Sequence, residues 1–343
     1  MSRARTAVVI CPGRGTYNKG ELGVLGRHFG DHVLMARFDA LRRADGQPTL
    51  SELDGAQNWS MAVHTRGDNA AALIFAATLA DFRSLQRVEV VAVTGNSMGW
   101  YSALACAGAL QAEDGFTLAN TMGTLMHEHA IGGQVLYPFL GDDWRPDPAR
   151  RSELLLLASE IDAREGHVLC LSIDLGGMLV LAGNEAGLAA FEAAVPPLQG
   201  RFPMRLANHA GFHCHLQQPV ADAGRERLSP ALFSQPALPL VDGRGNVWWP
   251  GASDTGALWD YTLGHQVVET YDFTQAITTA AREFAPDLFI VTGPGTTLGG
   301  AVAQSLILAN WRAMDSKADF QRLQAVDPLL VSMGMDDQRA LVV

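Results

Sequence analysis

Positive charge is scarce in this 343-residue chain. It has 25 lysines and arginines against 36 aspartates and glutamates, and its formal net charge is -11 at pH 7. A surface of that sign repels phosphate backbones and anionic lipid heads, so nucleic-acid and membrane functions are disfavoured. The excess of acid says little about small substrates, because a site can be locally basic within an acidic protein.

Cysteine is also rare, and no apolar stretch is long. The 4 cysteines lie far apart and form no CxxC pair, which argues against a disulfide scaffold or a zinc ribbon. No apolar run approaches the roughly 20 residues of a membrane helix, and the apolar part of the opening segment is too short for a signal peptide. Since 48% of the residues are hydrophobic, we expect a cytoplasmic globular protein with a sizeable core.

Segments typical of strands and helices alternate at both ends of the chain. Thr6–Cys11, Val88–Thr94 and Leu288–Thr292 are rich in β-branched or apolar residues and predict strands buried on both faces. A glycine-containing turn follows each of them, and helices are expected over Ser102–Leu110 and Leu298–Leu308. Strand, tight turn and helix form the repeating unit of a parallel α/β sheet.

The middle of the chain has a different pattern. Residues 134–207 predict strand, helix, two strands, helix and strand, which is the ferredoxin-like order. We therefore predict a ferredoxin-like (α+β) small subdomain over residues 131–206, inserted into a large α/β subdomain made of residues 1–130 and 207–343. The proline-rich stretch Leu228–Pro250 is expected to be a surface loop, and the acidic tail after Trp311 has no readable pattern.

The strongest local signal is the GxSxG segment Gly95–Gly99, which lies between a predicted strand and a predicted helix. In this context the serine, Ser97, sits on a strained turn, and the glycines allow neighbouring backbones to approach. The N–H of Met98 at the start of the helix can then stabilise an oxyanion. The segment predicts a nucleophilic serine, with a structural glycine-rich turn as the alternative.

A nucleophilic serine needs a base, and 10 histidines are available. His209, His213 and His215 lie just after the predicted insert, where the chain re-enters the large subdomain. A metal site that combines His213-Cys214-His215 with His127 and His129 is the alternative. No HExxH or similar helical spacing supports it, so no metal is expected.

Several segments resemble, in order, the malonyl-CoA:acyl-carrier-protein transacylases and the related acyltransferase domains of polyketide synthases. They are CPGRGT at residues 11–16, GNSMGWYSAL at 95–104, GMLVLAG at 177–183, AGFH at 210–213, QVVETYDF at 266–273 and GPG at 293–295. The resemblance implies an α/β-hydrolase-like core with a ferredoxin-like insert. It also implies a Ser-His dyad in which Ser97 is acylated, His213 is the base, and the main-chain carbonyl of Gln266 orients the imidazole. The N–H groups of Met98 and Arg14 would form the oxyanion hole.

The sequence departs from this family at the acyl pocket. Where malonyl-transferring members have an arginine that binds the carboxylate, this chain has Met122, which would line an apolar pocket. Asn96 and Trp100 replace a histidine and a glutamate beside the nucleophile. Phe212 matches members that accept acyl groups with an unbranched α-carbon. An uncarboxylated acyl group such as acetyl is therefore expected, with malonyl transfer through another cation, Arg14, as the alternative.

The resemblance implies a monomeric acyltransferase with no permanent cofactor. It would use acyl-CoA as donor and the phosphopantetheine thiol of an acyl carrier protein as acceptor. An acyl hydrolase and a catalytically idle scaffold are the alternatives. Because carrier proteins are acidic, a local basic patch is expected among five arginines in or beside the insert, namely Arg145, Arg150, Arg151, Arg201 and Arg205.

Overall fold

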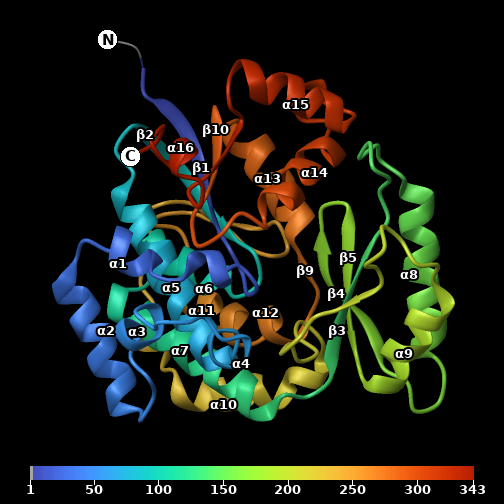
Figure 1. Cartoon of the computed structure of the whole chain (residues 1–343), viewed down its shortest axis with the longest axis horizontal. Coiled ribbons are helices and arrows are strands. Elements are labelled where there is room, and N and C mark those ends of the chain that lie inside the picture. Colours follow the sequence, from blue (N-terminus) through green and yellow to red (C-terminus); the bar gives the residue numbers. More distant parts are fainter. Residues whose placement is uncertain (1–2) are drawn as a thin grey trace.

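A computed structural model describes residues 3–343 and divides the chain between two sheets (Figure 1). The larger sheet has six strands in the order β11-β10-β1-β2-β7-β8. Every neighbouring pair is parallel except β7 with β8. Its strands are β1 (Arg5–Cys11), β2 (Val88–Gly95), β7 (Leu240–Val241), β8 (Val247–Trp248), β10 (Leu288–Val291) and β11 (Leu330–Ser332).

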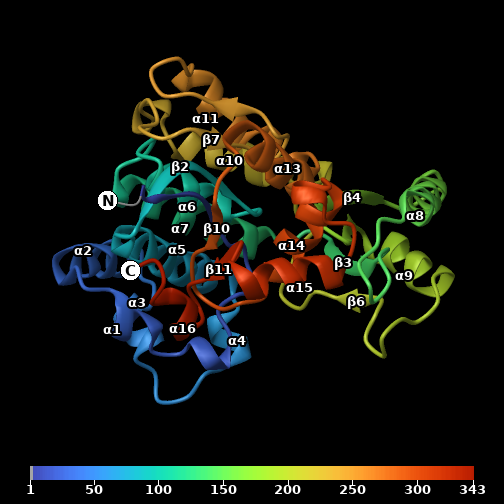
Figure 2. The same ribbon diagram turned by 90° about the horizontal axis from the view of Figure 1, so that it is seen from above.

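The helices of the large subdomain lie on both sides of this sheet (Figure 2). Those before the insert are α1 (Val24–His28), α2 (His32–Ala44), α3 (Leu50–Asp54), α4 (Met61–His64), α5 (Gly67–Ser84), α6 (Gly99–Cys106) and α7 (Ala112–His129). Those after it are α10 (Gln218–Arg227), α11 (Thr255–Leu263), α12 (His265–Val268), α13 (Phe273–Phe284), α14 (Gly299–Leu308), α15 (Lys317–Val326) and α16 (Asp336–Arg339). Within residues 3–343, none of the helices is both long and apolar enough to cross a membrane.

The smaller sheet has five strands in the order β6-β3-β5-β4-β9. They are β3 (Gly133–Pro138), β4 (Leu169–Leu175), β5 (Met178–Gly183), β6 (Met204–Arg205) and β9 (Tyr271–Asp272). Helices α8 (Pro148–Asp162) and α9 (Glu185–Ala194) cover its outer face (Figure 1). A separate hydrophobic core lies between these helices and the sheet, and its buried members run from Val135 to Phe202.

The α/β fold class with a ferredoxin-like subdomain is confirmed, but three segments differ from expectation. The stretch Leu228–Pro250 is not only loop, because it supplies β7 and β8, and Leu240 and Val241 are fully buried. The tail after Trp311 contains α15 and the sheet-edge strand β11. Strand β9, which lies outside residues 131–206, pairs in parallel with β4 and so extends the small sheet.

Candidate active site

Ser97 lies on a tight turn between β2 and α6, next to the loop that follows β1. Its φ is 56°, in the left-handed region that non-glycine residues seldom adopt. A Cβ added to Gly99 would collide with the backbone of Cys11, and one added to Gly95 would collide with the backbone of Gly99. The two glycines therefore allow the turn to form against β1, which leaves the Ser97 hydroxyl free to project from it.

His213 is held between the serine and a main-chain carbonyl. Its Nε2 lies 2.7 Å from Oγ of Ser97, and its Nδ1 lies 2.7 Å from the carbonyl oxygen of Gln266. Because a carbonyl can only accept, Nδ1–H is the donor and Nε2 is left to accept the proton of the serine hydroxyl. His213 also has a left-handed backbone, with φ 53°. The structure thus brings the three predicted residues together in the order that general-base activation of Ser97 requires.

Burial sets the protonation state of this histidine. Desolvation lowers the pKa of His213 to about 4, although its bond to the Gln266 carbonyl acts in the opposite direction. A pKa that low keeps the imidazole neutral at pH 7, and only the neutral ring can accept a proton.

The side chain of Gln266 makes a second connection to the turn. Its Nε2 donates to the carbonyl oxygen of Ser97 at 3.1 Å, and its Oε1 accepts from the hydroxyl of Tyr101 at 3.0 Å. Sequence reasoning did not single out Tyr101, although it lies within the family-like segment after Ser97. These bonds fix the segment that carries the orienting carbonyl to the segment that carries the nucleophile.

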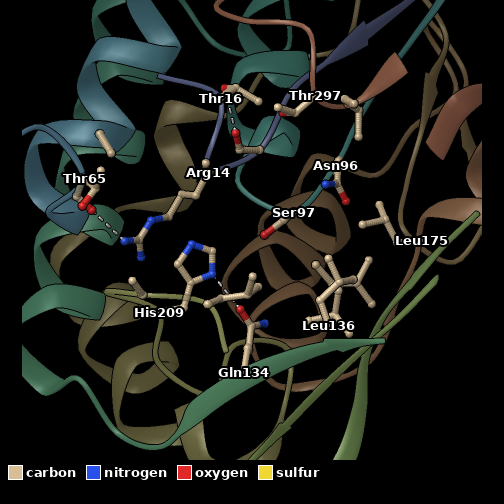
Figure 3. A pocket seen from close by; sticks show the side chains of 18 of the residues that line it. Arg14, Thr16, Thr65, Asn96, Ser97, Gln134, Leu136, Leu175, His209 and Thr297 are labelled. Atoms are coloured by element: carbon tan, nitrogen blue, oxygen red, sulfur yellow. Dashed lines mark hydrogen bonds between the residues drawn. The ribbon is translucent and has the colours of Figure 1, made fainter. Parts of the chain in front are cut away.

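A cavity of about 450 Å³ opens beside Ser97, between the two subdomains (Figure 3). Its small-subdomain wall is mainly apolar and includes Leu136, Ile173, Leu175 and Val180. The large-subdomain wall contributes Arg14, Asn96, Ser97, His209 and Phe212.

Asn96, Arg14 and Phe212 line this cavity as expected of binding residues, whereas Met122 and Trp100 do not. Met122 is fully buried in α7 and packs against Gly224 of α10. Trp100 is fully buried as well, and its indole N–H donates to Thr262. For these two residues the expected contact with substrate must be corrected, because their side chains point into the core of the large subdomain.

The two expected oxyanion donors come from the turn that carries the serine and from the loop that follows β1. Met98 is the first residue after the serine, at the N-terminus of α6. Gly13, just before Arg14, is so close to the elbow that a Cβ there would lie 2.6 Å from the Asn96 carbonyl oxygen and 3.4 Å from Cβ of Ser97. The main chain of Met98 and of Gly13, the residue before Arg14, is therefore beside the nucleophile.

A second, partly buried histidine lies on the cavity wall. Nδ1 of His209 is 2.8 Å from Oε1 of Gln134, which comes from β3 of the small subdomain. Burial and the nearby Arg14 cation hold the pKa of His209 well below its usual value. Gln134 had no signal in the sequence, because an alternating strand does not show which polar residue faces a cavity. Among residues 3–343, no group of three or more histidines, cysteines or acids is placed to hold a metal ion.

The arginines expected to form a basic docking patch are mostly neutralised. Four of them form ion pairs with carboxylates: Arg145 with Asp143 and Asp315, Arg150 with Glu153, Arg151 with Asp174, and Arg205 with Glu185 and Glu192. Arg201 stacks over Phe202. The expected patch must be corrected, because paired arginines leave little net positive charge for an acidic partner.

Comparison with known proteins gives one consistent resemblance. No family model matches the chain. This chain is 28% identical over 212 residues to the malonyl CoA-acyl carrier protein transacylase of Salmonella typhimurium. The aligned residues are 61% of this chain and 63% of that protein. The chain is 25% identical over 264 residues to the protein of the same name from Haemophilus influenzae, with 75% and 79% of the two chains covered. The chain therefore aligns with less than two thirds of the Salmonella protein's length.

Solved structures share the fold over most of the chain. An acyl-carrier-protein S-malonyltransferase from Burkholderia pseudomallei superposes with a TM-score of 0.73 at 22% identity, over 98% of each chain. A malonyl-transacylase solved in complex with a type II polyketide synthase acyl-carrier protein gives 0.70 at 21% identity, over 88% of this chain and 93% of that one. At these identities the likeness shows the fold: a large α/β core with a small ferredoxin-like subdomain.

Proposed function

We propose that this protein transfers an acyl group from a CoA thioester to the phosphopantetheine thiol of an acyl carrier protein through an acyl-Ser97 intermediate. The observation that carries the proposal is the line of hydrogen bonds from Ser97 Oγ through His213 to the Gln266 carbonyl. The similarity to malonyl CoA-acyl carrier protein transacylases supports the donor and the acceptor.

In the first half-reaction Ser97 Oγ attacks the thioester carbonyl while His213 Nε2 takes its proton. The carbonyl oxygen becomes negative and is stabilised by the N–H groups of Met98 and Arg14. The carbon–sulfur bond then breaks, and His213 returns the proton to the departing thiol. In the second half-reaction the carrier thiol gives its proton to His213 and attacks the acyl-serine ester, and the ester oxygen recovers that proton as Ser97.

The class of acyl group rests on the residues of the cavity. The expectation of an uncarboxylated acyl group depends mainly on Met122 lining the acyl pocket. In the structure Met122 lies outside the cavity. The apolar wall that the small subdomain contributes still favours an uncarboxylated acyl group. The carboxylated alternative has a cation, Arg14, on the cavity wall.

The experiment that tests the proposed function follows the fate of a preformed acyl-enzyme. Wild-type protein is acylated with an acyl-CoA, freed of excess donor and mixed with holo carrier protein or with buffer alone. We expect the acyl group to appear on the carrier protein much faster than it is lost to water. Loss at the same rate in both mixtures, with no acyl-carrier product, would identify a hydrolase.

A further inference from the structure

Tyr271 is a fully buried aromatic residue that contacts the nucleophile turn and the base at the same time. Its hydroxyl donates to the carbonyl oxygen of Gly95, the last residue of β2, at 2.6 Å. The centre of its ring lies 5.4 Å from that of His213, with the two planes at 53°. That spacing is within the range of favourable aromatic contacts. Because Tyr271 lies outside the cavity, these contacts are made to the dyad and not to the substrate.

The bond to Gly95 holds the start of the turn that carries the nucleophile. Ser97 comes two residues after Gly95 and has the left-handed φ of 56° that non-glycine residues seldom adopt. Burial holds the pKa of the Tyr271 phenol well above its usual value, so its hydroxyl stays protonated and remains a donor at neutral pH. A fixed donor on the Gly95 carbonyl limits the movement of the strand end from which the turn begins.

The ring of Tyr271 contributes to the burial of the base. Desolvation is the main cause of the lowered pKa of His213; the Gln266 carbonyl opposes it, and the neighbouring His265 of α12 lowers the pKa further. A ring in contact with the imidazole excludes water from the part that it covers. Removing the ring would admit water there and bring the pKa of His213 back toward the value of an exposed histidine.

The surroundings of Tyr271 hold it against the dyad from two directions. Strand β9 pairs with β4, which places Tyr271 opposite Ile173, and the Thr270 hydroxyl donates to the carbonyl oxygen of Leu171 at 2.7 Å. On the side of the large subdomain the ring packs on the backbone of Gly243, where an added Cβ would lie 2.6 Å from two of its carbon atoms. The side chain is therefore fixed between the two sheets.

We propose that Tyr271 is a positioning residue of the dyad formed by Ser97 and His213. Its hydroxyl holds the turn that presents the nucleophile, and its ring supports the imidazole and keeps water away from it. This assignment rests on the proposed acyl transfer and gives the dyad a second support beside the orienting carbonyl of Gln266. Sequence reasoning gave Tyr271 no role, although it lies in the family-like segment 266–273.

The test separates the hydroxyl of Tyr271 from its ring. Tyr271→Phe removes only the hydroxyl, and Tyr271→Ala removes the ring as well. Tyr137→Phe is the matched control, because Tyr137 is also fully buried and its hydroxyl donates to the carbonyl oxygen of Pro196 at 2.7 Å, in the small subdomain. Single-turnover acylation of Ser97 is measured by intact mass with malonyl-CoA and acetoacetyl-CoA, which have nearly equal shapes and differ by a carboxylate oxygen against a methyl group. Labelling by a fluorophosphonate measures the reactivity of Ser97 without CoA.

The two substitutions should have different effects. In Tyr271→Phe the maximal rate with every reagent should fall about two- to tenfold, because one hydrogen bond is lost, while the half-saturating concentration of each donor stays as in wild type. The pH at which acylation is half-maximal should remain near about 4 in this variant, because the ring is kept. In Tyr271→Ala that pH should rise toward about 6.5. Tyr137→Phe should change neither the rates nor this pH.

Each outcome decides the proposal. Wild-type rates in Tyr271→Phe, or an unchanged half-maximal pH in Tyr271→Ala, would overturn it. Equal rate losses in Tyr271→Phe and Tyr137→Phe would overturn it too, since they would report a general loss of stability, and this comparison holds even if Tyr271→Ala fails to fold. Fluorophosphonate labelling of wild type without acylation by any acyl-CoA would instead contradict the proposed function, and the labelling rates of the variants would then decide the role of Tyr271.

Discussion

The two sides of Ser97 differ in how far their polar groups are satisfied. On the base side, which comprises His213, Gln266 and Tyr101, the imidazole nitrogens and the Gln266 amide have hydrogen-bond partners. On the cavity side, Nε of Arg14 and Oδ1 of Asn96 are buried without partners. A complete network holds the base in place before substrate arrives, whereas the cavity side has no such network around its polar groups. The comparison separates residues that hold the base against the nucleophile from residues that line the cavity beside it.

The base side should give the largest effect. His213→Ala removes the proton acceptor, and acylation should fall by about 10²-fold or more. His209→Ala is the matched control, because it removes a partly buried histidine of the same cavity that contacts Gln134 instead of Ser97. Stopped-flow acylation assays with both variants would check the contrast. A near-normal rate in His213→Ala would remove this residue from the site.

The pH profile tests the same side without a substitution. Protonated His213 cannot accept a proton, and desolvation lowers its pKa to about 4. Acylation should therefore be constant through neutral pH and fall as the pH drops through about 4, while circular dichroism monitors folding. A midpoint near 6.5, the value of an exposed histidine, would contradict the burial that the structure shows.

A substitution of Met122 tests whether this residue belongs to the cavity or to the packed core. Met122→Ala should lower the free energy of unfolding by about 2–5 kcal/mol, because it leaves a hole in a packed core. It should not change the ratio of the acylation rates with malonyl-CoA and acetoacetyl-CoA, since Met122 lies outside the cavity. Urea denaturation and the acylation assay measure the two quantities. An altered ratio at unchanged stability would return Met122 to the acyl pocket.

Removing the hydroxyl of Tyr101, which belongs to the base side, should lower the acylation rate by a smaller factor. Tyr101→Phe leaves Oε1 of Gln266 without the hydroxyl that lies 3.0 Å away. A hydrogen bond of this kind contributes about 0.5–1.5 kcal/mol, so acylation should fall roughly two- to tenfold. The loss should be the same with malonyl-CoA and acetoacetyl-CoA, because the bond orients the base and does not touch the acyl group. A loss confined to one thioester would place Tyr101 on the cavity side.

Asn96 should give the smallest effect. Asn96→Ala removes one polar side chain from the cavity wall beside Ser97, and if that side chain binds the part of the substrate that all CoA esters share, the apparent affinity for both thioesters should weaken by about two- to tenfold together. Titrating the acylation rate with each CoA ester measures it. Unchanged affinity for both would show that Asn96 does not contribute to binding.

Much of the fold follows from local sequence patterns. Two-sided apolar runs followed by glycine turns predict β1, β2 and β10, and a changed order of patterns predicts the small subdomain. Strands β7, β8 and β11 are two or three residues long, which is too short to show a period. The pairing of β9 with β4 joins residues about 100 positions apart, so no local signal could reveal it.

In the candidate site, too, some residues can be predicted from local sequence and others only from the folded structure. Ser97 is predictable because the glycines around it have a steric purpose in the turn. Matching a family motif gives a residue's place in the chain but not the direction of its side chain, and for that reason Met122 and Trp100 were expected in the cavity. The unsatisfied atoms of Arg14 and Asn96 become visible only when their surroundings are known.

The most direct test of the account is whether Ser97 carries the acyl group. Wild type and Ser97→Ala are incubated with malonyl-CoA and acetyl-CoA, digested, and the peptide that contains residue 97 is sequenced by mass spectrometry. The account predicts an acyl adduct on Ser97 in wild type and none in Ser97→Ala. An unmodified Ser97 peptide with every donor, or an adduct that persists in Ser97→Ala, would contradict it.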